Sequence, residues 1–385
     1  RSARGIAMPI ELAQTIALID HHCHGITSKD LDYVNFQKFI SESYRPPPEG
    51  TSDFQKPVGL AVRRFCAPVL DLEKGVSGED YVRRRQELGP DEVNRRLMRA
   101  CGLSHLLIDT GHRASIILDV PAMAEVTAVP AHEVVRIEAL AEEIMRAGVS
   151  ADAFPNVFAD TLRKRSRNAV GLKTIVAYRT TFAIDYSPPS HEAVSQAAGQ
   201  WMRRAEVSGK WRLDDATIIR HLLWTAGEVC RERRFPLQSH VGVGDADILM
   251  HACDPTHFTP FIAAMDEWDV PITLLHCFPF MREACWLSEV FRNLYYDVGF
   301  TLNFAAPQSE VILAEALEMG KFSKMLYSSD AFGLPELYYL GAFLFRRSIS
   351  RVLDRWIAED FCSAQDADEI VSMIASGNAR RIYPI

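Results

Sequence analysis

Short apolar runs alternate along the chain with longer stretches whose apolar residues recur at helical spacing. The first run, IALIDHHCHG from Ile16 to Gly25, has four apolar or small residues before it becomes polar. An unbroken apolar run that ends in this way is typical of a strand buried on both faces, as the strands of parallel sheets are. Further strands are predicted at 103–111, 134–140, 169–179, 236–244, 271–278, 294–300 and 324–333.

Helical patterns separate these runs and have recognisable ends. The stretch 190–209 begins at Ser190, a favoured N-cap, and stops at Gly209. The helix after the last predicted strand opens with Pro335, which suits a first helical turn. About eight strands alternating with helices predict an α/β fold of the (β/α)₈ or TIM-barrel type. The alternative is an open doubly wound sheet, but the chain has none of the glycine-rich phosphate-binding motifs that would favour it.

Residues 26–100 hold too much helix for a simple connection between a strand and the next helix. The stretch SYRPPPEG at 43–50 must be a loop, and helical patterns flank it on both sides. We predict that this segment is a helical insertion that caps the site; the alternative is that it only thickens the scaffold. No repeat, low-complexity segment or evident linker divides the chain, so residues 1–385 are expected to form a single domain.

Composition and charge narrow the class of protein and of partner. The chain of 385 residues is 48% hydrophobic and 24% charged, which is typical of a soluble globular protein. A net charge of −8, with no Lys/Arg run to offset it, argues against nucleic acid as a partner. No apolar stretch is long enough to span a bilayer, and no signal-peptide pattern is present. A small-molecule substrate is expected, and assembly into a homo-oligomer stays open.

The cysteines indicate the compartment. The eight cysteines form no C-x-x-C pair, and several lie within apolar runs. They are therefore expected to be reduced, buried side chains of a cytoplasmic protein, and a cysteine-based zinc site is not expected.

Polar residues recur where the predicted strands end. Because the active sites of such barrels lie at the carboxyl ends of the strands, these side chains are expected to converge. Alternation along the first strand places Asp20, His22 and His24 on one face, with His21 and Cys23 on the other. Later strand ends add four candidates: Lys173, His240, His276 and Asp330. Each alone is compatible with an ordinary core residue, but their joint placement predicts a metal site.

This set of residues suits hydrolysis. Imidazoles and a carboxylate can bind a divalent cation and leave a position open for water. Such an ion lowers the pKa of the water toward neutrality, so that hydroxide becomes available for attack. Asp330 could take the proton and later pass it to a leaving amine. Lys173, which would be costly as an ammonium beside a cation, is expected either to stand away from the ion or to be carbamylated as a bridge between two ions.

The order of strands and candidate ligands resembles that of the amidohydrolase superfamily of metal-dependent barrels. Longer stretches resemble its FluG-like or nodulin-like branch, in which the barrel is often fused to a glutamine-synthetase-like domain. The stretches concerned are GLKTIVAYR, PLQSHVGVGDAD, LLHCFPFMREACWLSEVFRNLYYDVGF and MLYSSDAFGLPELYYLGA. The resemblance is strong over 169–340 and weak over 26–100.

The resemblance implies roles for the candidate ligands. It implies four ligands for the principal ion: His22, His24, His240 and Asp330. His276 would bind a second ion or polarise the substrate carbonyl. Lys173 stands where members with two ions carry the carbamylated lysine, whereas members with one ion leave this position idle, so the number of ions stays open. Zinc is expected first, and Mn, Fe or Ni would suit the same ligands.

Residues that follow two of the predicted strands are candidates for substrate binding. Tyr178 and Arg179 end the stretch 169–179, and His112 and Arg113 follow Gly111. The arginine side chain offers the bidentate fork that a substrate carboxylate needs. The alternative is that these residues form ordinary surface ion pairs.

Three functions are compatible with these patterns. The first hypothesis is a metal-dependent hydrolase that cleaves a C–N bond, an amide, in a small metabolite that carries a carboxylate. The FluG-like resemblance suggests an amide of the γ-glutamyl type. The second hypothesis is a single-metal decarboxylase or sugar-acid isomerase on the same ligands, since a fold does not determine a function. The third is a catalytically silent barrel that serves as a scaffold.

Overall fold

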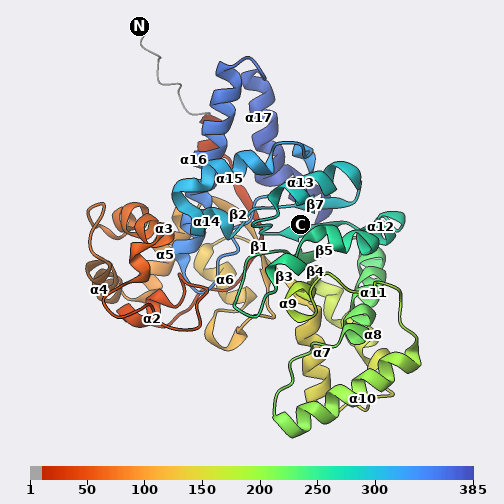
Figure 1. Ribbon diagram of the computed structural model, residues 1–385. Helices are drawn as coiled ribbons and strands as arrows, with labels where there is room; N and C mark the ends of the chain where they lie inside the picture. Colours follow the sequence, from red (N-terminus) through yellow and green to blue (C-terminus); the bar gives the residue numbers. More distant parts are fainter. Residues whose placement is uncertain (1–10) are drawn as a thin grey trace.

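A computed structural model describes residues 11–385 and shows strands gathered at the centre of a shell of helices (Figure 1). The strands are parallel and form one seven-stranded sheet, in which each strand pairs with the next along the chain. Their bounds are β1 Leu18–Cys23, β2 Leu103–Asp109, β3 Ala131–Arg136, β4 Ala169–Thr174, β5 Leu237–His240, β6 Ile272–Leu275 and β7 Leu294–Tyr296. This order, with helices between the strands, is that of an α/β TIM barrel, as the sequence predicted.

The segment after β7 closes the barrel without forming a regular strand. Leu326 donates its N–H to the Tyr296 carbonyl on one side, and the Tyr327 carbonyl accepts from the N–H of His21 on the other. The prediction of a full strand over 324–333 is wrong, because two features interrupt the ladder. The N–H of Ser329 bonds to a side chain of β1 instead of its backbone, and Asp330 has a φ of 49°, which breaks the extended backbone.

The helices end largely where the sequence indicated. Ser190 caps the helix over 191–208 through the N–H of Ala193, Gly209 ends it with a φ of 69°, and Pro335 opens the helix over 335–358. The bounds are α1 Glu11–Thr15, α2 Tyr33–Gln37, α3 Pro57–Ala61, α4 Gly78–Leu88, α5 Pro90–Ala100, α6 Val120–Thr127, α7 Ile137–Arg146, α8 Phe154–Arg165, α9 Val176–Arg179, α10 His191–Ser208, α11 Ala216–Arg233, α12 Thr259–Glu267, α13 Met281–Val290, α14 Thr301–Ala305, α15 Ser309–Ala316, α16 Pro335–Ala358, α17 Ala364–Ser372 and α18 Asn378–Ile382.

Each predicted strand that forms is shorter than expected, and the ends of β3 and β4 are two examples. The stretch 134–140 leaves the sheet after Arg136, and the stretch 169–179 leaves it after Thr174. Glu138 explains the end of β4, because it lies in the first turn of α7 and its carboxylate accepts from the Thr174 hydroxyl and the Ile175 N–H. The end of β4 is thereby tied to a helix, and the residues that follow it wind into the short helix α9.

The side chains of β1 do not alternate as the sequence predicted. The pairing of β1 with β2 shifts register between Asp20 and Cys23, as it does at a β-bulge. His21 therefore turns into the barrel, where both ring nitrogens have buried partners, and His22 beside it also turns inward. Asp20 accepts instead from the N–H and the hydroxyl of Ser329. The predicted division into two faces is wrong, because strict alternation holds only where each residue has one partner.

The core has two parts. A large apolar cluster fills the space between the sheet and the surrounding helices. A smaller cluster fills the inside of the barrel, where Ile382 and Tyr383 of the C-terminal segment pack against Ile19, Val170 and Tyr295 from the strands. The C-terminal segment thus plugs the barrel interior below the strand ends that carry the predicted ligands.

The segment 26–100 lies mainly at the side of the barrel, in orange in Figure 1. Its helices α3 and α5 pack against α14 and α16. A buried ion pair anchors it, because Arg85 of α4 donates to Glu336 of α16 at 2.5 Å and Tyr81 donates to the same carboxylate oxygen at 2.9 Å. Arg85 is 3% exposed and Glu336 is fully buried.

Replacing Arg85 with methionine is expected to lower the free energy of unfolding by about 3–5 kcal/mol, because it leaves the Glu336 carboxylate buried without its counter-ion. Urea unfolding followed by circular dichroism measures this change. Arg95→Met is the matched control. The Arg95 side chain of α5 is 46% exposed, so water screens its ion pair with Glu92. Equal losses in the two variants would contradict a role of the buried pair in anchoring the segment.

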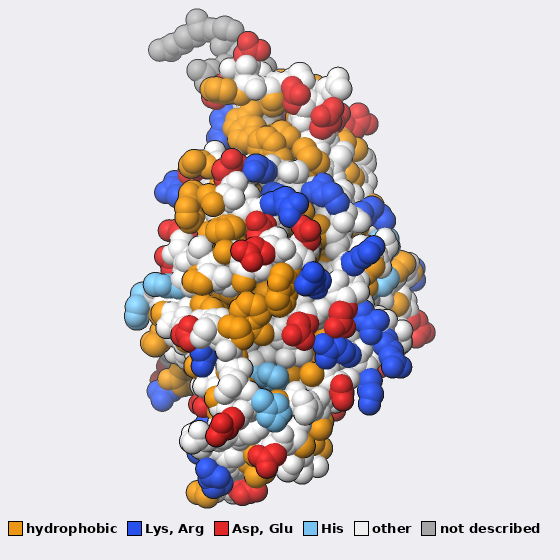
Figure 2. All heavy atoms as spheres, turned by 90° about the vertical axis from the view of Figure 1, so that its right-hand side faces the viewer, with side chains coloured by type: hydrophobic (Ala, Val, Ile, Leu, Met, Phe, Trp, Pro, Cys, Tyr) orange, Lys and Arg blue, Asp and Glu red, His pale blue; other side chains and the backbone are white. Residues whose placement is uncertain are grey.

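Charged and hydrophobic side chains share the surface of the protein, and its cysteines are unpaired. Figure 2 shows acidic and basic side chains mixed over one face, with hydrophobic side chains in separate patches. All eight cysteines are free, and all but Cys362 are buried. Within residues 11–385, no helix combines the length and the apolar character needed to cross a bilayer.

Candidate metal centre

A pocket of about 1060 Å³ opens at the carboxyl ends of the strands. Residues 33–53 of the segment after β1 and the loops that follow the strands form its walls. All the side chains that the sequence predicted for the site line this pocket: His22, His24, His112, Arg113, Lys173, Tyr178, Arg179, His240, His276 and Asp330. The predicted cap therefore reaches the pocket only through its first part.

The carboxylate of Asp330 lies at the centre of this group. Its Oδ1 is 3.1 Å from Nε2 of His22 and 3.4 Å from Nε2 of His24, and its Oδ2 is 3.3 Å from Nδ1 of His276. Burial alone would raise the pKa of Asp330, but the surrounding imidazoles outweigh this effect and hold the pKa well below its usual value. Asp330 therefore stays ionised at neutral pH.

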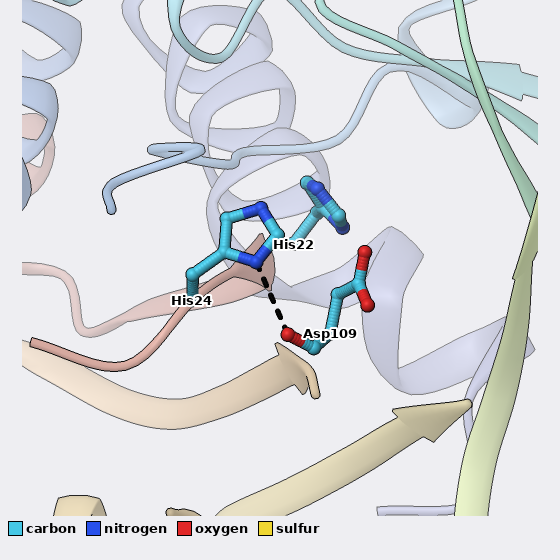
Figure 3. A group of neighbouring side chains, drawn as sticks. All are labelled: His22, His24 and Asp109. Carbon is cyan, nitrogen blue, oxygen red and sulfur yellow. Dashed lines mark hydrogen bonds between the residues drawn. The ribbon is translucent and has the colours of Figure 1, made fainter. Parts of the chain in front are cut away.

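The second nitrogen of each β1 imidazole is held by an acceptor. Nδ1 of His22 lies 2.8 Å from the side-chain oxygen of Gln238, and Nδ1 of His24 lies 3.1 Å from the backbone carbonyl of Asp109 (Figure 3). Because a carbonyl oxygen only accepts, each Nδ1 carries the proton, and the Nε2 lone pairs face Asp330. Burial, followed by the charge of Lys173, lowers the pKa of His22 to about 3, so this ring is uncharged.

His276 adds a third nitrogen to this group. Within residues 11–385, its buried Nδ1 has no hydrogen-bond partner, and burial lowers its pKa to about 4. An ionised carboxylate thus faces two imidazole lone pairs and a further unpartnered nitrogen. This donor set fits a divalent cation. The residues that would hold it are His22, His276 and Asp330, whose ligand atoms lie within 4.8 Å of one another, with His24 against the same carboxylate.

His240 lies beside this group with a different orientation. Its ring centroid is 4.8 Å from that of His276 and 4.4 Å from that of Tyr178, and its Nε2 is 3.2 Å from the Gly242 carbonyl. Burial, followed by the neighbouring His276, keeps its pKa well below the usual value. In this arrangement His240 is a neutral neighbour of the other ligands, with Nε2 turned toward the backbone of its own loop.

Lys173 reaches the same point from β4. Its Nζ is 3.4 Å from Nε2 of His22, and the residue is 1% exposed. Burial lowers the pKa of the amine to about 8. A buried amine with a lowered pKa is more readily present in its uncharged form, which is the form that reacts as a nucleophile.

Comparison with known proteins agrees with this centre. The family model described as amidohydrolase matches residues 118–385, a range that includes Lys173, His240, His276 and Asp330. The chain belongs to the amidohydrolase family. The match begins after β1, so the placement of His22 and His24 in the same centre comes from the structure.

A relative of this amidohydrolase is the protein fluG of Emericella nidulans, which is 27% identical over 411 residues. The alignment covers 97% of this chain and 46% of fluG, so the chain spans about half the length of that relative. This match to fluG agrees with the FluG-like resemblance seen in the sequence.

Solved structures share the fold. A protein of Lactobacillus casei assigned as a metal-dependent hydrolase superposes with a TM-score of 0.83 at 23% identity, over 97% of this chain and 96% of the other. The uronate isomerase of Thermotoga maritima superposes with a TM-score of 0.63 at 12% identity, over 97% and 96%. Proteins with this barrel fold therefore include one assigned as a hydrolase and one assigned as an isomerase.

Asp109 is a further member of the amidohydrolase centre that sequence reasoning missed. His22, His24 and Asp109 form a second group whose ligand atoms all lie within 4.8 Å of one another, and Figure 3 shows the three side chains together. Burial alone would raise the pKa of Asp109, but the guanidinium of Arg136, 2.5 Å away, outweighs it and keeps the pKa low. The signal was available, since Asp109 ends β2 just as His240 ends β5.

The four residues predicted to bind substrate differ in how freely they face the pocket. Arg179 donates through Nη1 to Glu142 at 2.5 Å and to the Leu213 carbonyl at 3.0 Å, while its Nε has no acceptor within residues 11–385. Arg113, exposed over the ring of Phe332 at 5.9 Å, has no ion-pair partner in the described part of the chain. Of the two arginines predicted to bind substrate, Arg113 is therefore the one whose guanidinium is not already paired.

The other two predicted substrate-binding residues, Tyr178 and His112, pack against aromatic rings. Tyr178 packs on His240, and a Cβ built on Gly244 would come within 1.8 Å of the Tyr178 hydroxyl, so a larger residue there would displace the Tyr178 ring. His112 lies between His24, at 5.3 Å between ring centroids, and Phe332, at 4.7 Å. Burial lowers the pKa of His112 to about 2, so it offers a neutral ring.

Proposed function

We propose that this amidohydrolase cleaves a C–N bond, an amide, in a small substrate that carries a carboxylate. The observation that carries the proposal is the convergence of His22, His24 and His276 on the ionised carboxylate of Asp330, at the floor of an open pocket. A divalent ion, zinc first, would supply electrophilic activation of water and of the scissile carbonyl when bound there. An amide of the γ-glutamyl type is proposed on the strength of the likeness to fluG.

Asp330 is the general base and acid of the proposed reaction. As an ionised carboxylate it accepts a proton from the attacking water, and it then delivers this proton to the nitrogen of the leaving amine. The tetrahedral carbon collapses as that C–N bond breaks, so a carboxylic acid and a free amine are released. His276, whose uncharged ring lies against the same carboxylate, would either bind the ion or donate to the carbonyl oxygen during this step.

The test is to assay the zinc-loaded protein against a panel of γ-glutamyl and other carboxylate-bearing amides, and to measure the released amine and the metal content of the protein. Turnover that is lost on chelation and restored by zinc is the expected result. Release of carbon dioxide, or formation of a sugar-acid isomer instead of an amine, would favour a decarboxylase or isomerase. A retained ion without turnover on any of these substrates would favour a scaffold.

In this proposal Arg113 binds the carboxylate of the substrate, and this role can be tested separately. Arg113→Met is expected to raise KM about tenfold or more with little change in kcat, because an ion pair to a remote carboxylate contributes equally to the ground and transition states. Steady-state kinetics on a substrate found by the panel measures the split. Arg212→Met is the matched control, since Arg212 lines the same pocket but is paired with Asp247 at 2.7 Å. An unchanged KM in Arg113→Met would remove the proposed carboxylate contact.

A further inference from the structure

A buried chain of hydrogen bonds runs beneath the metal centre and reaches the substrate pocket only at His22. Nε2 of His21 is 2.8 Å from Asp297, and Nδ1 of His21 is 2.9 Å from the hydroxyl of Tyr383. Nε2 of Gln238 donates to the same hydroxyl at 2.9 Å, and the side-chain oxygen of Gln238 lies 2.8 Å from Nδ1 of His22. All five residues are buried.

The acceptors fix the direction of each bond. Gln238 also donates through Nε2 to the backbone carbonyl of His21 at 2.7 Å, so its amide oxygen must face His22. His22 therefore carries its proton on Nδ1. The Tyr383 hydroxyl accepts from Gln238 and donates its single proton to His21, which in turn donates from Nε2 to Asp297. Each donor along this chain has an acceptor, and the lone pair that remains on His22, at Nε2, faces Asp330 and Nζ of Lys173 at the metal centre.

The other end of the chain holds a second candidate ligand. Oδ1 of Asp297 accepts from the backbone N–H of His276 at 3.0 Å and from that of Gly299 at 2.8 Å. His276 has a φ of 68°, a left-handed conformation that a non-glycine residue keeps only where its surroundings hold it. The hydroxyl of Thr301 donates to the carbonyl of His276 at 3.1 Å and completes this restraint.

We propose that Gln238 and Tyr383 are positioning residues of the metal centre, which hold His22 in the tautomer that leaves Nε2 free for the ion and fix it relative to His276. Neither residue touches the ion or the substrate pocket. The inference rests on the proposed ion binding and is independent of which bond is cleaved. A group that orients a ligand imidazole through its second nitrogen typically changes metal affinity strongly.

The competing explanation is that Tyr383 only fills space, since its ring also packs against the apolar interior of the barrel. The two explanations differ in what the hydroxyl does. Removing the hydroxyl while keeping the ring leaves the packing intact, so a filling role predicts unchanged metal affinity. A positioning role predicts weaker binding of the ion.

The experiment measures the zinc dissociation constant by competition with a chromophoric chelator. Gln238→Met is expected to weaken zinc binding about 10–100-fold, and Tyr383→Phe about three- to tenfold, the size of one ordinary hydrogen bond. Tyr296→Phe is the matched control, because it removes a buried hydroxyl that donates to the Ala316 carbonyl away from this chain. Its zinc affinity should equal that of the unchanged protein.

Nitrogen NMR of the histidine rings in the metal-free protein gives a second readout that does not depend on catalysis. His22 should appear with its proton on Nδ1 in the unchanged protein and as a mixture of tautomers in Gln238→Met. If the unchanged protein binds no zinc, the proposed function fails. If it binds zinc and Tyr383→Phe binds equally well with the tautomer of His22 unaltered, the positioning role fails. Tyr383→Phe serves this test even if Gln238→Met does not fold.

Discussion

Asp330→Asn is expected to lower turnover about 10⁴-fold, the upper range for losing a general acid–base group. The carboxamide has nearly the same volume but cannot accept the proton of the attacking water or return it to the amine. It also cannot supply the negative charge that faces the imidazoles of His22, His24 and His276 at 3.1–3.4 Å. Single-turnover kinetics with the best amide from the panel measures the chemical step directly.

The metal content of the variant separates the two roles of Asp330. If the variant loses turnover but still binds the ion, the main contribution of Asp330 is proton transfer. If the variant loses both turnover and the ion, the main contribution is metal binding. Asp245→Asn is the matched control, because Asp245 is an exposed carboxylate at the rim of the same pocket. If Asp330→Asn kept more than a tenth of the activity, the proposed mechanism would be wrong.

Lys173→Met is expected to lower turnover about 100-fold or more, as the loss of a group that acts on a metal ligand does. We expect this variant to bind one equivalent of metal fewer than the unchanged protein. The reason is geometric: Nζ lies 3.4 Å from Nε2 of His22, the histidine that both candidate ligand groups share. Carbon dioxide adding to the neutral amine, with loss of one proton, would give the anionic oxygen ligand that such a bridge needs.

Metal analysis and the intact mass measured under bicarbonate test this prediction. Lys324→Met is the control, because Lys324 is also buried, at 8% exposure, but its Nζ lies against the ring of Tyr295, 4.3 Å from the ring centroid, outside the pocket. An unchanged ion count together with unchanged turnover in Lys173→Met would rule out a ligand role for this lysine.

The local features of the fold were predictable from the sequence because they depend on neighbours along the chain. The N-cap Ser190, the stop at Gly209 and the opening Pro335 act over a single helical turn, and all three stand where the pattern placed them. The strand ends over 134–140 and 169–179 were not predictable in the same way. Glu138 ends β4 through a contact between elements, and no local propensity records such a contact.

The candidate site was predictable in its membership more than in its geometry. The polar residues at the strand ends share one pocket, because parallel strands of a barrel deliver their carboxyl ends to one rim. Asp109 was missed although it ends a strand in the same manner, and the predicted faces of β1 failed at the bulge. The turn of His240 toward the Gly242 carbonyl likewise depends on the loop that follows β5.

The sequence by itself determined which chemical groups stand at the strand ends and that the strands alternate with helices, since both are properties of residue order and spacing. Only the tertiary structure decided how the barrel closes through the irregular segment after β7. It also decided which way each imidazole turns and which residues hold it there. The reason is the distance along the chain between the partners. His21 and Tyr383, which bond beneath the site, are 362 positions apart, and such a contact exists only once the whole barrel has closed.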